Sequence, residues 1–378
     1  MFFLLCLLAA TPTHDPKPTP LIGGERFALP SRIMGEDRTI YVTLPRGYQT
    51  QQKSYPVVYM TDGQTHLDHT TASIAFLAEN GRMPEMIVVA VANTQRTRDL
   101  TPPPNPGKKV CCGADRFLDF FEKELFAEID KRYRTQPFRV FAGHSYGGLF
   151  AVHAFLSRNE VFQAYLAVSP TLFWADHDPV ERLDRFLKNR TSLASSLVVV
   201  QGNEHPKMNP PFREFVDILG KRRIDGFFAA HRQIDDEDHG SVVLRANYWG
   251  LQQIFSFWPI TPETQKGGLA EHLDHFKKIS QRMGYPVTMT ESHCNRLGYQ
   301  LLQQGDQAAA IEAFLWNTSH YPSSANAFDS LAEAYEERGD LDKALANYRK
   351  ALQLAQQNRE ETGYYRNNVA RIVAKKKP

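Results

Sequence analysis

Cysteine is scarce in this chain, with four residues among 378. Cys111 and Cys112 are adjacent, and Cys294 lies far from them in the sequence. Small domains held together by disulfides are dense in cysteine, and structural zinc sites use ligands at short, regular spacings. We therefore expect neither a disulfide framework nor a metal site.

A strong excess of charge of either sign is also missing. The chain carries 44 Lys and Arg against 42 Asp and Glu, for a net charge of +2. Such a balance gives no long-range attraction to nucleic acid. The short basic runs Lys221–Arg223 and Lys375–Lys377 are isolated and indicate a solvated helix end and a tail. Nucleic acid is not an expected partner.

No apolar run near the start of the chain is long enough to cross a membrane. Met1–Ala10 is an apolar run of ten residues, whereas a membrane-spanning helix needs about 20. The run resembles the apolar part of a secretory signal peptide followed by the Pro-rich Thr11–Pro20, although no basic residue precedes it. We expect residues 1–20 to be a signal peptide with a Pro-rich segment. The protein would then be exported, periplasmic or secreted, and the alternative is cytoplasmic.

Short β-rich apolar runs alternate with helical patterns between Arg38 and Trp258. The strand candidates are Thr39–Leu44, Val57–Met60, Ile87–Ala92, Arg139–Ala142, Ala164–Val168, Leu197–Val200 and Phe227–Gln233. The helix candidates are Asp115–Tyr133, Gly147–Leu156 and Pro179–Leu187. Continuous apolar runs such as Val198–Val200 are typical of strands buried on both faces of a parallel sheet. The pattern predicts an α/β domain over residues 21–260 with a doubly wound, mostly parallel sheet.

An internal repeat replaces the strands after Gly284. Six residues recur 34 positions later with the same or a similar type: Leu297, Gly305, Asp306, Ala310, Ile311 and Phe314. This period is that of the tetratricopeptide repeat, a helix–turn–helix unit. We expect a helical connector over 261–290 and a small all-α repeat domain over 291–378, capped by a helix at Glu361–Ala374. Such repeats could contact a protein partner or form a dimer.

The strongest chemical signal is the G-x-S-x-G segment Gly143–Gly147. It follows the strand candidate Arg139–Ala142 and precedes a helix candidate, which is the strand–turn–helix context of the α/β-hydrolase nucleophile. Small residues permit the sharp turn that exposes the serine hydroxyl at the edge of the sheet. The segment predicts the α/β-hydrolase fold with Ser145 as nucleophile.

A serine hydroxyl needs a base, which comes last in the chain order of this fold. His239 follows the last strand candidate and opens the final helix, so it is the predicted base. His205 and His231 are alternatives, and His231 lies inside an apolar strand pattern.

The acid that orients this histidine should follow the preceding strand. Glu204 comes directly after the strand Leu197–Val200 and is the predicted acid. The alternatives are Asp235, Asp236 and Asp238, or a serine–histidine dyad without an acid.

Two backbone N–H groups should bind the oxyanion of the tetrahedral intermediate. The residue after the nucleophile, Tyr146, is expected to supply one. The loop after Val57–Met60 is expected to supply the other, from Gln64 or from Gly63.

Two further segments leave strands at the same edge of the sheet. Arg96 and Arg98 could pair with an anionic group of a substrate, or they could be exposed loop charges tied to Asp99. Trp174 could form a wall for an apolar or aromatic acyl group, or it could belong to the core.

These segments resemble the esterase-D-like serine esterases, a family that includes the enterobactin and salmochelin trilactone hydrolases and the feruloyl esterases. The resemblance covers roughly Glu25–Pro259. Its motifs are Met60–Gln64, Ala142–Gly148, Ser169–Trp174, Gly202–Glu204 and Asp238-His239. The chain is similar in particular to the siderophore-esterase branch, some members of which also carry C-terminal tetratricopeptide repeats. The resemblance implies hydrolysis of a carboxylic ester by Ser145 and His239, and the family accepts siderophore lactones, acyl esters and thioesters.

The sequence therefore predicts a serine esterase with a small-molecule ester as substrate. The chemistry calls for no metal ion and no organic cofactor. An acyltransferase or a peptidase with the same three residues is one alternative. The other is a scaffold whose repeats dock a protein partner.

Overall fold

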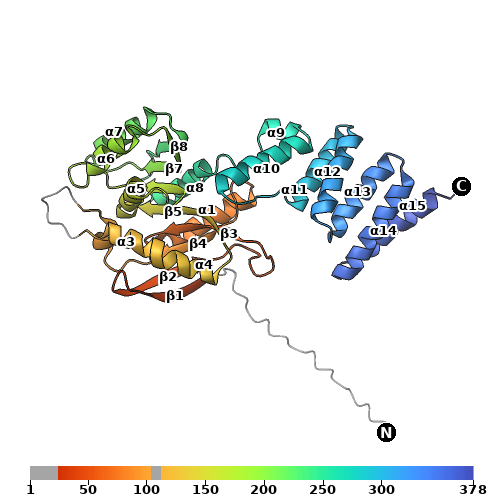
Figure 1. The fold of residues 1–378 in the computed structure, drawn as a ribbon, viewed down its shortest axis with the longest axis horizontal. Helices are drawn as coiled ribbons and strands as arrows, with labels where there is room; N and C mark the ends of the chain where they lie inside the picture. The colour runs from red at the N-terminus through yellow and green to blue at the C-terminus, as the bar shows by residue number, and fades with distance from the viewer. Residues whose placement is uncertain (1–23, 104–111, 378) are drawn as a thin grey trace, which may run out of the picture.

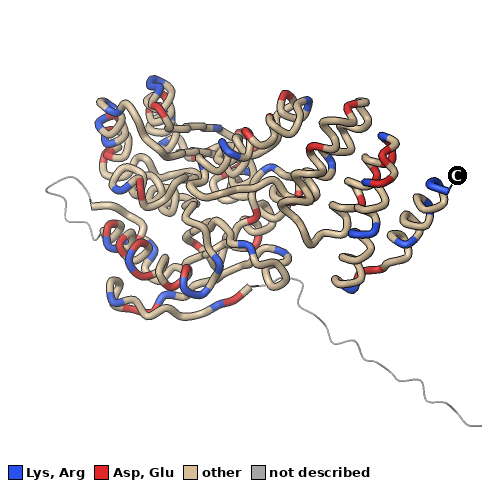
Figure 2. Tube along the Cα trace, turned by 45° about the vertical axis from the view of Figure 1, so that its right-hand side comes forward, with Lys and Arg blue, Asp and Glu red and all other residues tan. Residues whose placement is uncertain are grey.

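The computed structural model of the protein describes residues 24–103 and 112–377 (Figure 1). The predicted signal peptide and Pro-rich segment, residues 1–20, lie outside the described residues. Within the described ranges, no helix is both long enough and apolar enough to span a bilayer. Figure 2 shows basic and acidic residues interspersed along the chain.

An eight-stranded sheet forms the centre of the first part of the chain, in the order β1-β2-β4-β3-β5-β6-β7-β8. The strands are β1 (Gly24–Ser31), β2 (Glu36–Thr43), β3 (Tyr55–Met60), β4 (Ile87–Val91), β5 (Thr135–His144), β6 (Ala164–Val168), β7 (Ser192–Gln201) and β8 (Asp225–Gln233). Strands β4, β3, β5, β6, β7 and β8 pair in parallel, and β1–β2 and β2–β4 pair antiparallel. The sheet is thus mixed but mostly parallel, as predicted.

All seven predicted strands are present, and β1 is the strand that the sequence did not predict. It pairs only through β2 and is exposed along most of its length. Its sequence contains Pro30, which a sheet tolerates at an edge because one side of an edge strand needs no ladder hydrogen bonds. A strand that buries so little apolar surface leaves a weak pattern in the sequence.

Helices cover both faces of the sheet. One face carries α2 (Arg96–Leu100), α3 (Ala114–Phe120), α4 (Phe126–Arg132), α5 (Tyr146–Ser157), α6 (Asp178–Leu187) and α7 (Asn209–Gly220). The other face carries α1 (Gly63–Glu79), α8 (Val242–Ile254) and α10 (Leu269–Met283). Successive β7 residues point to opposite cores, Val199 to the first and Val198 to the second. The strand β7 is therefore buried on both faces of the sheet, as its continuous apolar run predicted.

The predicted helix Asp115–Tyr133 is interrupted by a π-helical turn, η1 (Phe121–Leu125), between α3 and α4. Phe120 and Phe121 are both fully buried although they are neighbours in sequence. A π turn inserts an extra residue into the helix and shifts its buried face. That shift lets two adjacent phenylalanines reach the same core.

The helix α10 belongs to two cores at once. Ile279 and Met283, each 1% exposed, pack with the strands and α8 of the hydrolase part. Leu269, at the other end of α10, packs with the helices that follow. Helix α10, which lies within the predicted connector 261–290, therefore contributes to both cores. Figure 1 shows α10 between the sheet and the C-terminal helices.

The C-terminal region is all-helical, as predicted. Its helices are α11 (Glu291–Gln303), α12 (Gln307–His320), α13 (Ala325–Glu337), α14 (Leu341–Asn358) and α15 (Gly363–Lys375), preceded by the short α9 (Pro262–Lys266). Gly305 and Gly339 lie in the turns of two helix pairs with φ of 81° and 84°, the region in which glycine is favoured. The assignment of these pairs to the tetratricopeptide repeat stays a prediction.

Replacing Ile279 by Ala should lower the free energy of unfolding of the whole chain. A buried isoleucine cut to alanine typically costs about 2–5 kcal/mol, because the surroundings close the cavity only in part. The measurement is chemical denaturation followed by circular dichroism. Leu315→Ala, at a side chain that is 46% exposed, is the control and should change little. An Ile279→Ala protein as stable as the control would contradict the packing of α10 into the hydrolase core.

Candidate active site

The site begins at a strained turn between β5 and α5. Ser145 is the N-cap of α5 and has φ 59° and ψ −114°, a conformation that costs energy outside glycine and clusters at functional sites. A Cβ added to Gly143 would lie 2.2 Å from the Gly147 carbonyl oxygen, and one added to Gly148 would lie 2.8 Å from that of Val168. Side chains at these positions would break the turn. The motif glycines therefore hold the Ser145 hydroxyl at the carboxyl edge of the sheet.

A chain of two hydrogen bonds links Ser145 to the predicted base and acid. His239 Nε2 lies 3.0 Å from Ser145 Oγ, and His239 Nδ1 lies 2.8 Å from Glu204 Oε2. A carboxylate only accepts, so Nδ1 carries the proton and Nε2 offers its lone pair to the hydroxyl. The Glu204 side chain is 1% exposed and that of His239 is 42% exposed. The arrangement places a buried anion behind an accessible imidazole.

The acid and the base meet because their loops are packed together. A Cβ added to Gly202 would lie 2.8 Å from the Glu237 carbonyl oxygen, so the loop after β7 runs directly against the loop after β8. The Asn203 N–H also donates to the Glu237 carbonyl, at 2.6 Å. The packed loops thereby bring together Glu204 and His239, which lie 35 positions apart in the sequence.

The environment keeps Glu204 ionised. Burial raises the pKa of its carboxyl, but hydrogen bonds from His239 and Ser169 outweigh burial and leave the pKa below its ordinary value. An ionised carboxylate stabilises the imidazolium that forms when a histidine takes a proton from serine.

The alternative acids have other hydrogen-bond partners. Asp236 pairs with Arg245, and Asp238 accepts the N–H groups of Gly240 and Ser241. The Asp235 carboxylate accepts a hydrogen bond from the Gln233 side chain. Ser145, His239 and Glu204 are the three predicted residues that the structure brings into one hydrogen-bonded chain.

The predicted oxyanion donors stand at the starts of two helices. Tyr146 is the first residue of α5, and Gly63 and Gln64 are the first two of α1. The first N–H groups of a helix lack acceptors within the helix and carry its positive end. A Cβ added to Gly147 would lie 2.5 Å from Thr61 Oγ1, so the loop before α1 passes against the start of α5. The loop that leads into α1 therefore lies against the start of α5, whose N-cap is Ser145.

The two predicted substrate-binding arginines are held by carboxylates of the protein. Arg98 Nε lies 2.6 Å from Asp99 Oδ1, and Arg98 Nη2 lies 2.6 Å from Glu36 Oε1. Arg98 thus pairs with Asp99, as in the alternative to substrate binding that the sequence left open. Arg96 Nε lies 2.6 Å from Asp62 Oδ1. Each guanidinium therefore already has an anionic partner.

Trp174 is half-buried beside Tyr146, the residue that follows Ser145. Its ring stands edge-on to the Tyr146 ring with centroids 5.9 Å apart, and its Nε1–H donates to the Pro102 carbonyl at 3.2 Å. The indole therefore has a fixed orientation next to the start of α5, where it can form one wall of a substrate site.

Sequence reasoning missed the role of His144, the variable residue before the serine. Its Nε2 donates to the backbone carbonyl of His239 at 2.7 Å, and the two rings lie 4.7 Å apart. The His66 ring stands edge-on to it at 5.3 Å. Burial, together with the neighbouring His239 and His66, lowers the pKa of His144 to about 4. The motif marks this position, but only the folded chain shows that the imidazole holds the loop of His239.

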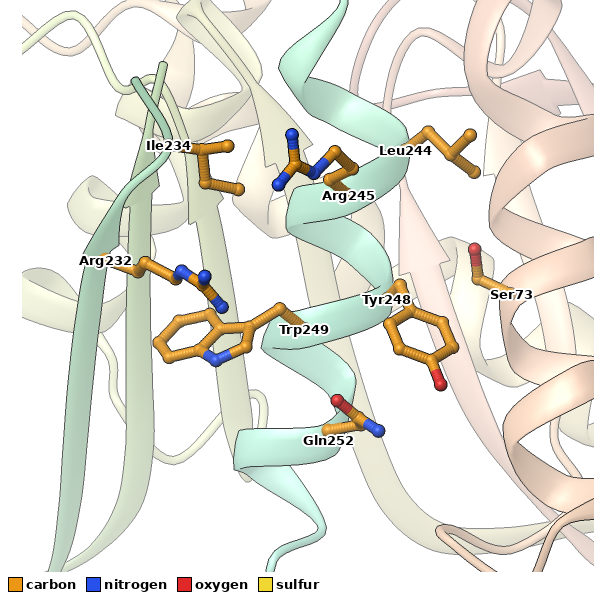
Figure 3. A pocket seen from close by; sticks show the side chains of 8 residues that line it. All are labelled: Ser73, Arg232, Ile234, Leu244, Arg245, Tyr248, Trp249 and Gln252. Carbon is orange, nitrogen blue, oxygen red and sulfur yellow. The ribbon is translucent and has the colours of Figure 1, made fainter. Parts of the chain in front are cut away.

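A separate cavity of about 390 Å³ lies over the outer face of α8. In Figure 3, Arg232 and Trp249 lie on one side of this helix, and Tyr248 and Ser73 lie on the other. Ser145, His239 and Glu204 are not among the residues that line it. Over the described ranges, no three His, Cys, Asp or Glu side chains are placed to hold a metal ion.

Comparison with known proteins identifies relatives of this chain. The family model described as "Putative esterase" matches residues 31–216. The siderophore triacetylfusarinine C esterase of Aspergillus fumigatus is 28% identical, over 65% of this chain and 97% of the relative. The siderophore enterobactin esterase of Emericella nidulans is 30% identical, over 53% of this chain and 82% of the relative.

Solved structures confirm the predicted α/β-hydrolase fold. The IroE-like serine hydrolase from Shewanella oneidensis is 28% identical with a TM-score of 0.67, over 79% of this chain and 99% of that one. An uncharacterised protein from Capnocytophaga ochracea has a TM-score of 0.70 over 93% of this chain and 100% of that one. At 17% identity, this second likeness concerns the fold alone.

The unfolding free energy should fall as the pH drops from 6.5 toward 4. Histidine in the unfolded chain has an ordinary pKa of 6.5, whereas that of folded His144 is about 4. Between these values the unfolded chain binds more protons, so acid favours unfolding, and above pH 6.5 the contribution of His144 is constant. His144→Gln keeps a donor and cannot titrate, so its stability should depend less on pH in this window. Denaturant titrations at several pH values measure the effect, and an equal slope in both proteins would contradict it.

Proposed function

This chain belongs to the esterase family and is a serine-type carboxylic ester hydrolase, and on that premise we propose that Ser145 carries its chemistry. The observation that supports the proposal is the chain from Glu204 through His239 to Ser145, with hydrogen bonds of 2.8 and 3.0 Å. Nucleophile, base and orienting acid in this order are the arrangement that acyl transfer requires.

In the proposed reaction, Ser145 Oγ attacks the ester carbonyl while His239 Nε2 takes the hydroxyl proton. Glu204 stabilises the imidazolium that forms. The N–H groups of Tyr146 and of Gln64 or Gly63 bind the oxyanion. Collapse of the tetrahedral intermediate breaks the ester C–O bond, and His239 gives its proton to the departing alcohol. Water then attacks the acyl-enzyme while His239 takes a proton from it. The bond between Ser145 Oγ and the acyl carbon breaks, His239 returns the proton to Oγ, and the carboxylic acid leaves.

The substrate class that we propose is a siderophore-like ester. The support is the two relatives, which are described as esterases of the siderophores triacetylfusarinine C and enterobactin. The matched family segment, residues 31–216, contains Ser145 and Glu204. Trp174, fixed next to Tyr146, is the proposed wall for an acyl group. Arg98 is left out of the proposed substrate site because Glu36 and Asp99 already compensate its charge.

Two further parts of the proposal concern the ends of the chain. We propose that the helix pairs α11–α12 and α13–α14 are tetratricopeptide repeats that contact a protein partner or a second copy of the chain. The 34-residue period and the left-handed glycines of their turns support this. The apolar run Met1–Ala10 supports export of the protein.

Ser145→Ala should lower ester turnover by about 10⁴–10⁶-fold, because the nucleophile is lost while the fold remains. Glu204→Gln should lower it by up to about 10⁴-fold, because the imidazole loses its orienting anion. The assays are hydrolysis of p-nitrophenyl esters of increasing acyl length and hydrolysis of enterobactin. Ser319→Ala, at an exposed serine of α12, is the matched control and should match the wild type.

The acyltransferase and the scaffold alternatives each give a different result in these assays. A wild type that prefers an added alcohol or amine to water as acyl acceptor would be an acyltransferase. A wild type that is inert on every ester, or a Ser145→Ala variant with full activity, would contradict the proposed chemistry and favour the scaffold. The ratio of enterobactin to simple-ester turnover separates a siderophore esterase from a general esterase.

A further inference from the structure

One guanidinium touches both segments that are proposed to bind the oxyanion. Arg96 Nε donates to Asp62 Oδ1 at 2.6 Å, and Nη2 donates to Asp62 Oδ2 at 3.2 Å. The same Nη2 donates to the His144 carbonyl at 3.1 Å. Asp62 immediately precedes Gly63 and Gln64 at the start of α1, and His144 immediately precedes Ser145 at the start of α5. Arg96 therefore ties the starts of two helices together.

The backbone just before α1 has an uncommon conformation. Asp62 has φ 57° and ψ 36°, in the left-handed region, which costs energy outside glycine, although aspartate adopts it more readily than most residues. It is 5% exposed, and its Oδ1 also accepts a hydrogen bond from Asn93 Nδ2 at 2.5 Å. Burial raises the pKa of Asp62, but Arg96 and Asn93 outweigh burial and leave that pKa below its ordinary value. The contacts thus hold a buried anion in a strained turn.

We propose that Arg96 is a positioning residue: it sets the distance between the two oxyanion donors, through Asp62 on one side and the His144 carbonyl on the other. The inference rests on the proposed function, because the donors matter only if Ser145 forms a tetrahedral intermediate. The sequence suggested instead that Arg96 pairs with an anionic group of the substrate. In the structure, its guanidinium already binds the Asp62 carboxylate through two nitrogens.

The two roles differ in the kinetic constant that they affect. Oxyanion donors act in the transition state, where donor and oxyanion must lie about 2.7–3.1 Å apart. A displaced donor therefore lowers kcat and leaves KM nearly unchanged, whatever the charge of the substrate. A residue that binds an anionic group of the substrate instead changes KM, and only for substrates that carry the anion.

The experiment compares Arg96→Gln with the wild type on two esters, neutral p-nitrophenyl acetate and anionic p-nitrophenyl hemisuccinate. We expect kcat to fall about 10²-fold on both esters, the loss typical of a misplacement of about 1 Å. We expect KM to stay within about threefold. The rate at which a fluorophosphonate labels Ser145 should fall in parallel, because the labelling reaction uses the same donors.

Arg222→Gln is the matched control. Arg222 also binds one carboxylate and one backbone carbonyl, both of Asp184, and its side chain is 30% exposed against 32% for Arg96. Its contacts join α6 to the end of α7 and do not involve the oxyanion segments. We expect it to keep the kinetic constants of the wild type. Thermal unfolding of both variants shows whether a loss of activity reflects a loss of fold.

A double mutant tests whether Arg96 acts through Asp62. Asp62→Asn removes the anion that Arg96 holds, so Arg96→Gln combined with Asp62→Asn should lose little more than the worse single variant. Losses that multiply would show independent roles and overturn the proposed coupling. Arg96→Lys retains the charge without the two-pronged geometry and should recover only part of kcat.

The remaining outcomes separate this inference from the function on which it rests. A loss confined to the KM of the hemisuccinate ester, or an Arg96→Gln protein with wild-type kcat, overturns the positioning role and leaves the esterase standing. A wild type that neither hydrolyses the esters nor reacts with the fluorophosphonate overturns both. An Arg96→Gln protein that is unfolded under assay conditions, while Asp62→Asn is folded and fully active, also overturns the positioning role.

Discussion

The close approach of backbone around Ser145 is the constraint on which the site depends. The serine can adopt φ 59° only because the neighbouring glycines leave no side chain between the turn, the strand β6 and the loop before α1. A single added methyl group at Gly143, Gly147 or Gly148 would lie within 2.2, 2.5 or 2.8 Å of another atom. The strain of one residue is thus balanced by contacts of its neighbours, which hold the hydroxyl in place.

The parallel sheet converts this local turn into a site, because the carboxyl ends of its strands meet at one edge. The segments after β3, β5, β7 and β8 carry Gln64, Ser145, Glu204 and His239 to this edge. Hydrogen bonds between the segments then fix their relative positions. His144 binds the carbonyl of His239, and the loop of Glu204 packs on the loop of His239 through Gly202. The strand ends bring the four residues to one edge of the sheet, and the contacts between the loops fix their relative positions.

The difference between strand order and contacts between loops explains what the sequence could and could not predict. Ser145 was identifiable because the strain of its turn requires glycine at fixed spacings, which appears in the sequence as a short motif. Glu204 and His239 were identifiable because strand order limits where they can stand. The contacts of Arg96 were not identifiable, since its partner Asp62 is 34 positions away and a loop arginine reads equally well as a substrate ligand. The strand β1 and the helix α1 were missed for another reason: one is mostly exposed, and the other opens with glycine and is rich in threonine.

The helix α10 gives the C-terminal region a fixed relation to the hydrolase. Its last turns complete the core over β7 and α8 through Ile279 and Met283, and its first turn enters the core of α11–α14 through Leu269. His272 of α10 also shares a hydrogen bond of 2.9 Å with His293 of α11, and burial lowers the pKa of His293 to about 4. In such a bond, the N–H of one neutral imidazole donates to the lone pair of the other. Two protonated imidazoles have no lone pair to accept it. The connection through α10 is therefore packed and hydrogen-bonded on both sides rather than a free linker.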